Sequence, residues 1–157
     1  MNIKKILYPT DFSEYSMVAL PYAIDLSKQN KAELHCLHVV DLAYDGFMRD
    51  SYMIPLVSLP EISQSEILKL AKARLDKFVA DNLAVVKPLV TKAIIGEPFV
   101  EIIRYARGQA VDLIVMGTHG HSALAAMLLG SVAEKVVRKA PCPVLTVRHP
   151  KHRFKAP

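Results

Sequence analysis

Glycines and a serine in the second half of the chain are spaced so that they could bind a phosphate group. Two residues separate Gly117 from Gly120, and nine more precede Gly130 and Ser131. Glycine lets the backbone approach a phosphate closely, and the N–H groups of a helix that starts near Ser131 can donate to its oxygens. The pattern is neither a Walker loop nor a Rossmann fingerprint. A structural alternative exists, since Ser131 and Glu134 form a Ser-x-x-Glu capping box and Gly117 suits a turn.

Asp11 is a second candidate for ligand contact, because it follows an apolar run over residues 3–8. Its alternative role is to cap a helix, with Glu14 three residues further on. His119 and His121 would add titratable groups beside a phosphate. These motif residues contain no Ser, His and acid set, no paired carboxylates and no nucleophile with its base. The sequence therefore favours binding over catalysis.

Five apolar runs are predicted as the strands that position these residues: 3–8, 33–40, 88–94, 111–116 and 143–147. The run at 113–116 does not alternate, which is typical of parallel strands covered on both faces. Helices are predicted over 13–30, with Pro21 as a point of kinking, over the periodic segments 68–79 and 98–106, and over 131–139. This alternation predicts an α/β fold: a single doubly wound, five-stranded parallel sheet with helices on both faces. Its ligand would lie beyond the carboxyl ends of the strands.

Three further features of the sequence can be interpreted from residue type and spacing alone. The connection over residues 42–60 is long and aperiodic, and is either a variable surface insertion or a lid or partner-contact segment. His35 and His38 are expected on one face of a strand, as structural residues without a function. Cys36 and Cys142 are too few for a disulfide framework and are predicted to be small buried residues.

Length, composition and charge define the broad class of the protein. The chain has 157 residues, of which 52% are hydrophobic, enough for one globular domain. Its net charge is +5; Arg148, Lys151, Arg153 and Lys155 provide four of these charges, which leaves +1 for residues 1–147. We therefore predict one globular domain over residues 1–148, a basic flexible tail over 149–157, and no nucleic-acid partner.

The sequence also predicts where the protein works. Its apolar stretches are far shorter than the roughly 20 residues of a membrane span. Pro9 interrupts the apolar start before a signal-peptide core could form. We expect no membrane association and a cytoplasmic location.

Taken together, the motifs resemble those of the universal stress protein family, in its nucleotide-binding branch. The matching segments cover nearly the whole chain: Ile-Leu-Tyr-Pro-Thr-Asp-Phe-Ser at 6–13, then 37–40, Gly-Glu-Pro at 96–98, 112–120, 130–133 and 140–145. The family's Gly-x2-Gly-x9-Gly-Ser motif is complete, and it marks members that resemble ATP binders. The resemblance implies the strand order 3-2-1-4-5, which places the loops after the first and fourth strands side by side.

The resemblance also implies an adenine nucleotide, ATP or else ADP or AMP, as the ligand of the following residues: Pro9, Thr10, Asp11, Val39, Val40, Met116, Gly117, His119, Gly120, Gly130, Ser131 and Val132. Asp11 would contact the ribose or adenine, Val39 and Val40 the base, and Gly130 and Ser131 the phosphates. Mg²⁺ would bridge phosphate oxygens, because the sequence has no dedicated cluster of metal ligands. Family members often carry a basic or hydroxyl residue in the region of His119.

Three hypotheses about function follow from this resemblance. The first is a nucleotide-dependent stress-response or signalling module that acts on a protein partner not identified by the sequence. The second is a slow ATPase or self-phosphorylating protein with Ser131 near the γ-phosphate. The third is an interaction module that works without nucleotide. The resemblance further implies a homodimer formed through the last strand, residues 143–147.

Overall fold

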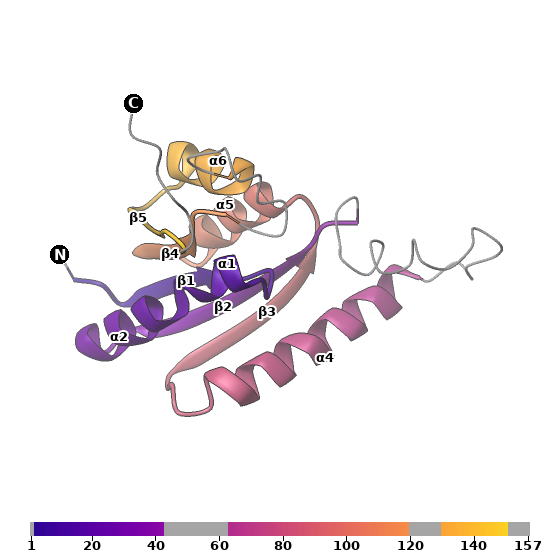
Figure 1. Cartoon of the computed structure of the whole chain (residues 1–157), viewed down its shortest axis with the longest axis horizontal. Helices are drawn as coiled ribbons and strands as arrows, with labels where there is room; N and C mark the ends of the chain where they lie inside the picture. Colours follow the sequence, from indigo (N-terminus) through magenta and orange to yellow (C-terminus); the bar gives the residue numbers. More distant parts are fainter. Residues whose placement is uncertain (1, 43–62, 120–129, 151–157) are drawn as a thin grey trace.

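Five parallel strands form one sheet in the order β3-β2-β1-β4-β5 (Figure 1). The computed structural model describes residues 2–42, 63–119 and 130–150. The strands are β1 (Lys5–Pro9), β2 (Glu33–Val40), β3 (Leu89–Ile95), β4 (Leu113–Gly117) and β5 (Val144–Val147). Each neighbouring pair runs parallel. The predicted doubly wound sheet and its strand order are therefore confirmed.

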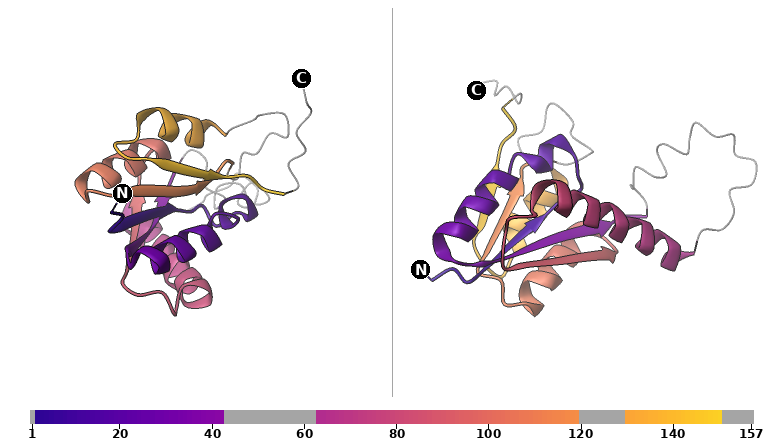
Figure 2. Two further views of the ribbon diagram at one scale, coloured as in Figure 1. Left: turned by 90° about the vertical axis from the view of Figure 1, so that its left-hand side faces the viewer. Right: turned by 90° about the horizontal axis from the view of Figure 1, so that it is seen from below.

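Helices cover both faces of this sheet (Figure 2). One layer contains α1 (Glu14–Met17), α2 (Leu20–Asn30) and α4 (Gln64–Asn82), and the other contains α5 (Pro98–Gly108) and α6 (Ser131–Lys139). Alternate residues of β1 face the two layers: Ile6 and Tyr8 pack in the core with α2 and α4, and Leu7 packs with α5 and α6. Burial on both sides explains why the strands are apolar without alternation.

The segment between β1 and β2 differs from the prediction. A single kinked helix was expected over residues 13–30, but α1 ends at Met17 and α2 begins at Leu20. Pro21 lies in the first turn of α2, where its missing N–H needs no partner. The prediction was wrong because proline at this position starts a second helix instead of kinking the first one.

The start of β4 also lies later than predicted, at Leu113 instead of residue 111. The end of α5 uses the intervening residues, because Ala110 adopts a left-handed φ of 52° and Val111 N donates to Ala106 O at 2.9 Å. Asp112 then accepts the backbone N–H groups of Lys4 and Lys5 at 2.8 and 2.9 Å. These bonds join the beginning of β1 to the beginning of β4.

The two histidines of β2 lie on opposite faces of the sheet, contrary to the prediction. His35 Nδ1 and the Tyr105 hydroxyl of α5 are 2.9 Å apart, whereas His38 Nδ1 donates to Thr10 O at 2.9 Å on the other side. Residues three apart cannot share a strand face, since side chains alternate with a period of two. Cys36 is buried as predicted, and burial raises its pKa to about 12. Cys142 is half-buried.

Several predictions concern residues outside the described part of the chain. They include most of the 42–60 connection, the tail beyond residue 150, Gly120 and His121. Within the described ranges, no helix is both long and apolar enough to span a membrane.

Candidate functional site

The ends of β1 and β4 lie next to each other at the carboxyl edge of the sheet. β1 pairs with β4 through Ile6 and Leu113 and through Leu7 and Ile114, and with β2 on its other side. The connections therefore diverge at this edge, one leading to α1 and the other toward α6 (Figure 1). In open α/β sheets this switch point is where ligands bind.

Pro9 and Thr10 form a buried wall at the end of β1. Thr10 N donates to Leu37 O at 2.9 Å, so the chain stays attached to β2 beyond the strand itself. The Thr10 hydroxyl lies 3.1 Å from the Ser16 hydroxyl and accepts the Phe12 N–H at 3.0 Å. These contacts fix the position of the loop.

Asp11 organises the turn into α1 but does not cap that helix. Its Oδ1 accepts the Ser13 backbone N–H at 3.0 Å and the Ser13 hydroxyl at 2.6 Å. Ser13 is the N-cap residue and accepts the N–H of Ser16. The alternative that Asp11 caps the helix is therefore wrong, and its carboxylate lies beside the N-cap of α1.

Phe12 and His38 stiffen this turn, and sequence reasoning missed this role for both residues. Phe12 has a φ of 63°, a conformation uncommon for a residue with a large side chain. Its ring lies 4.3 Å from the His38 ring and 5.3 Å from the Phe78 ring, and the Arg74 guanidinium lies 4.7 Å above it. The sequence signal that could have indicated this role is the aromatic side chain of Phe12 between Asp11 and Ser13.

Val39 and Val40 end β2 beside this loop. Val40 is buried and its carbonyl accepts the N–H of Gly96 at 3.0 Å. Val39 is half-buried and packs against the core under α5 and α6. Val39 is thus the more exposed of the two.

On the other side of the crevice, β4 ends in Met116 and Gly117, both buried. A Cβ atom on Gly117 would lie 2.1 Å from Tyr15 O, so glycine is required for α1 to approach β4. His119 is 7% exposed, its Nδ1 lies 2.9 Å from the Thr118 hydroxyl, and its ring is 6.4 Å from that of Tyr15. Tyr15 therefore connects the two loops, a role that its sequence position does not reveal.

Helix α6 begins at the same edge without a side-chain cap. Gly130 is its N-cap, in an ordinary extended conformation with a φ of −67°, and Gly130 N donates to Thr118 O at 2.7 Å. Ser131 is the first helical residue and is exposed, and Val132 is half-buried. The predicted capping box is therefore wrong, because Ser131 follows the N-cap position. A Cβ on Gly130 would lie 3.0 Å from Thr118 O, so close approach explains this glycine.

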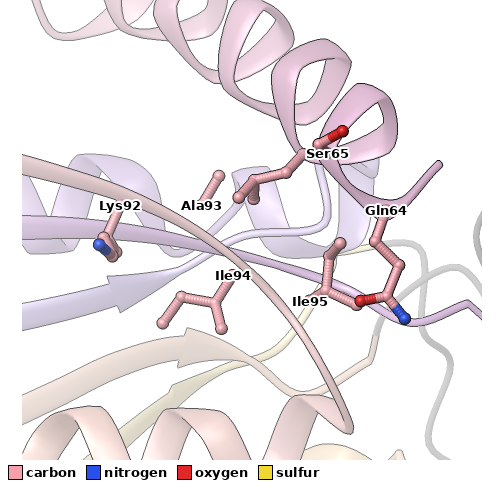
Figure 3. A pocket seen from close by; sticks show the side chains of 7 residues that line it. Gln64, Ser65, Lys92, Ala93, Ile94 and Ile95 are labelled. Carbon is pink, nitrogen blue, oxygen red and sulfur yellow. The ribbon is translucent and has the colours of Figure 1, made fainter.

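Two further observations bear on what the site could hold. Within residues 2–42, 63–119 and 130–150, no three His, Cys, Asp or Glu side chains are grouped so that they could hold a metal ion. A groove of about 390 Å³ lies elsewhere, between the start of α4 and β3 (Figure 3). Its lining, which includes Gln64 and Ile95, contains none of the predicted nucleotide contacts.

Sequence and structure comparisons agree on one family. The Universal stress protein family pattern matches residues 2–148. Universal stress protein MJ0577 of Methanocaldococcus jannaschii is 34% identical over 157 residues, which covers 92% of this chain and 94% of that protein. Universal stress protein YxiE of Bacillus subtilis is 37% identical over 148 residues, which covers 92% and 98%.

The solved structure of MJ0577 superposes with a TM-score of 0.76 at 31% identity and covers 96% of this chain and 99% of the other. Fold and site define a doubly wound α/β protein with its switch point between β1 and β4. The chain belongs to the universal stress protein family. A universal stress protein solved in complex with cAMP shares the fold, with a TM-score of 0.68 at 21% identity.

Proposed function

We propose that this universal stress protein binds an adenine nucleotide, ATP or else ADP or AMP, between the loops after β1 and β4. The observation that carries the proposal is the start of α6. Its first turn lacks a side-chain cap, and its N-cap Gly130 is held against Thr118 at the end of β4. The N–H groups at such a helix end can donate to phosphate oxygens, and the helix dipole favours the negative charge.

The remaining crevice residues suit the other parts of the nucleotide. Asp11 presents a carboxylate that can accept hydrogen bonds from ribose hydroxyls. Met116 and Val39 offer apolar contact to the ribose and base, in line with the complete Gly-x2-Gly-x9-Gly-Ser motif. A Mg²⁺ ion would take its ligands chiefly from phosphate oxygens and water, the common arrangement for this ion.

Relatives with this fold are consistent with an adenine nucleotide as the ligand. One universal stress protein was solved in complex with cAMP, and another, from Archaeoglobus fulgidus, in complex with dAMP. Both are distant from this chain, at 21% and 19% identity, and support the fold's capacity for such ligands. The proposal of ATP itself rests on the Gly-x2-Gly-x9-Gly-Ser motif of this chain.

The biological role that we propose is nucleotide-dependent stress response or signalling. In this role bound nucleotide changes the order of the crevice loops and the choice of a protein partner. In the described part of the site, the hydroxyls of Thr10 and Ser13 are engaged in hydrogen bonds with Ser16 and Asp11.

Ser131→Ala tests the proposed phosphate contact. Loss of one hydrogen bond to a charged group corresponds to about 1.5–3 kcal/mol, so the Kd for ATP measured by calorimetry is expected to rise about tenfold or more. The stability of the protein should change by less than about 0.5 kcal/mol, because Ser131 caps nothing. Ser65→Ala is the matched control, since Ser65 is an exposed serine in the first turn of α4. Equal affinity of wild type and Ser131→Ala would show that the Ser131 hydroxyl does not contact the phosphates.

Two simpler measurements separate the three functional hypotheses. Acid extraction of the purified protein should release an adenine nucleotide. If no nucleotide is released and calorimetry detects no heat of ATP binding, the interaction module that works without nucleotide is the remaining hypothesis. Timed release of inorganic phosphate then distinguishes a binding protein, with no turnover above the buffer rate, from a slow ATPase.

We also propose a homodimer formed through β5. This strand pairs with β4 alone among the described strands and ends the sheet, and its Leu145 is 36% exposed. Exposed apolar edges are ordinarily paired or covered. Sedimentation equilibrium should give twice the 17.4 kDa of the chain, and Leu145→Lys should shift the protein to monomer. A 17.4 kDa species alone at micromolar concentration would contradict the dimer.

A further inference from the structure

A surface groove between α5 and α6 is separate from the nucleotide crevice. Its volume is about 530 Å³, and it is lined by Phe99, Val100, Ile103, Arg104, Arg107, Gly108 and Lys139. None of the residues predicted to contact nucleotide lines it. The groove therefore needs an explanation of its own.

The groove combines an apolar floor with a basic rim. Phe99, Val100 and Ile103 are half-buried, and their spacing of three and four residues places them on one side of α5. The ammonium groups of Lys135 and Lys139 lie 4.4 and 5.4 Å from the centre of the Phe99 ring. Both lysines of α6 are exposed but lie within cation–π distance of the Phe99 ring, and Lys139 lines the groove.

The positive charge of this rim is only partly compensated. Arg104 pairs with Glu101, and Lys135 lies 3.6 Å from Glu97. Arg107 and Lys139 have no carboxylate partner in the described part of the chain. The helix dipole explains why cations occur in the last turns of α5 and α6, but it does not require apolar side chains between them.

We propose that the groove docks an acidic amphipathic segment of a partner protein. Leucine or aromatic side chains of the segment would cover Phe99, Val100 and Ile103, and its carboxylates would pair with Arg107 and Lys139. Charge complementarity selects this occupant: two uncompensated cations border a small apolar floor. A nucleic acid would instead bind best to a broad positive surface, whereas residues 1–147 have a net charge of only +1. This surface would let the protein recruit its partner away from the nucleotide.

A short synthetic peptide in which glutamates alternate with leucine and phenylalanine can serve as the probe. Amide chemical-shift changes on titration are expected in α5 and α6. The double charge reversal Arg107→Glu with Lys139→Glu should weaken peptide binding about tenfold, since each lost ion pair contributes a few tenths to 1 kcal/mol and is replaced by repulsion. Lys69→Glu with Lys72→Glu is the control. It makes the same change in net charge at two exposed lysines of α4, a helix that does not line the groove. This control should leave the affinity within about twofold of wild type.

Four outcomes would overturn the proposal. The first two are an equal loss of peptide affinity in both double variants and amide chemical-shift changes located outside α5 and α6. The other two are tighter binding of phosphatidylglycerol vesicles or single-stranded DNA than of the peptide, and a change of oligomeric mass caused by the Arg107 and Lys139 reversal. The last result would show that a second copy of the chain occupies the groove. Wild-type circular dichroism in both variants confirms that they fold, and the ATP affinity of each is measured separately.

Discussion

Gly117→Ala tests how closely α1 packs against the end of β4. The new Cβ would lie 2.1 Å from Tyr15 O and 3.0 Å from Tyr15 C, both backbone atoms. Real Cβ atoms essentially never lie within 3.0 Å of a heavy atom outside their own and neighbouring residues. The distance from the new Cβ to Tyr15 O must therefore increase from 2.1 to at least 3.0 Å. The backbone of α1 must move, because no side chain can rotate away.

Overpacking of a well-packed region costs about 1–3 kcal/mol, and the backbone contact places this substitution at the upper end of that range. With a urea m-value of about 2 kcal/mol per molar, the unfolding midpoint should fall by about 1–1.5 M. The displacement of Tyr15 also disturbs its contact with the His119 ring. We therefore expect the affinity for ATP to decrease together with the stability.

Gly108→Ala is the matched control for this experiment. No atom lies within 4 Å of the position where its Cβ would be, and Gly108 is the last residue of α5. Alanine favours the helix by up to about 1 kcal/mol, so the urea midpoint should stay constant or rise. A Gly117→Ala midpoint within about 0.2 M of the wild-type value would refute the close packing of α1 on β4.

Three further predictions concern stability, each measured by urea unfolding. Asp112→Ala removes the acceptor of two backbone N–H groups and should cost about 1–2 kcal/mol at neutral pH. These bonds hold the pKa of Asp112 below its usual value near 3.8. The difference in free energy of unfolding between wild type and variant is therefore complete above that value and should vanish as pH falls through the lowered pKa. A difference that stays constant down to about pH 2 would contradict this explanation. Tyr8→Phe removes a buried hydroxyl that donates to Ser16 O at 3.2 Å and should cost about 1 kcal/mol, whereas an unchanged midpoint would mean that water replaces it. Ser63→Ala breaks the capping box with Glu66 and should also cost about 1 kcal/mol, a loss that Ser63→Asp, another good N-cap, should largely avoid.

The fold was predictable because strands buried on both faces leave an unmistakable pattern. The strand predicted over 33–40 has these bounds in the structure, and the helix over 131–139 begins and ends as expected. Errors arose where one residue can serve two structural purposes. Pro21 suited both a kinked helix and a first turn, and Ser131 suited both an N-cap and a first helical residue.

The candidate site was less predictable, since contacts distant in sequence decide its details. Gly117 and Gly130 were recognised from their spacing, but the reason for each glycine is the close approach of Tyr15 O or Thr118 O. Gly130 has an ordinary φ of −67°, so the conformational freedom of glycine is not what this position uses. Among the described residues of the candidate site, Phe12 has the left-handed conformation, which no glycine pattern could indicate.

The central position of β1 has a consequence for synthesis of the chain. β1 is made first, and one of its edges pairs with β2, about thirty residues later. Its other edge accepts β4, whose residues begin at Leu113, and Asp112 reaches the start of β1 across more than a hundred positions in sequence. A ribosome-bound chain that ends before β4 therefore carries an unpaired apolar strand edge in the middle of its future sheet. Such edges are prone to aggregation and slow to close, so nascent chains of intermediate length are the ones most dependent on chaperones.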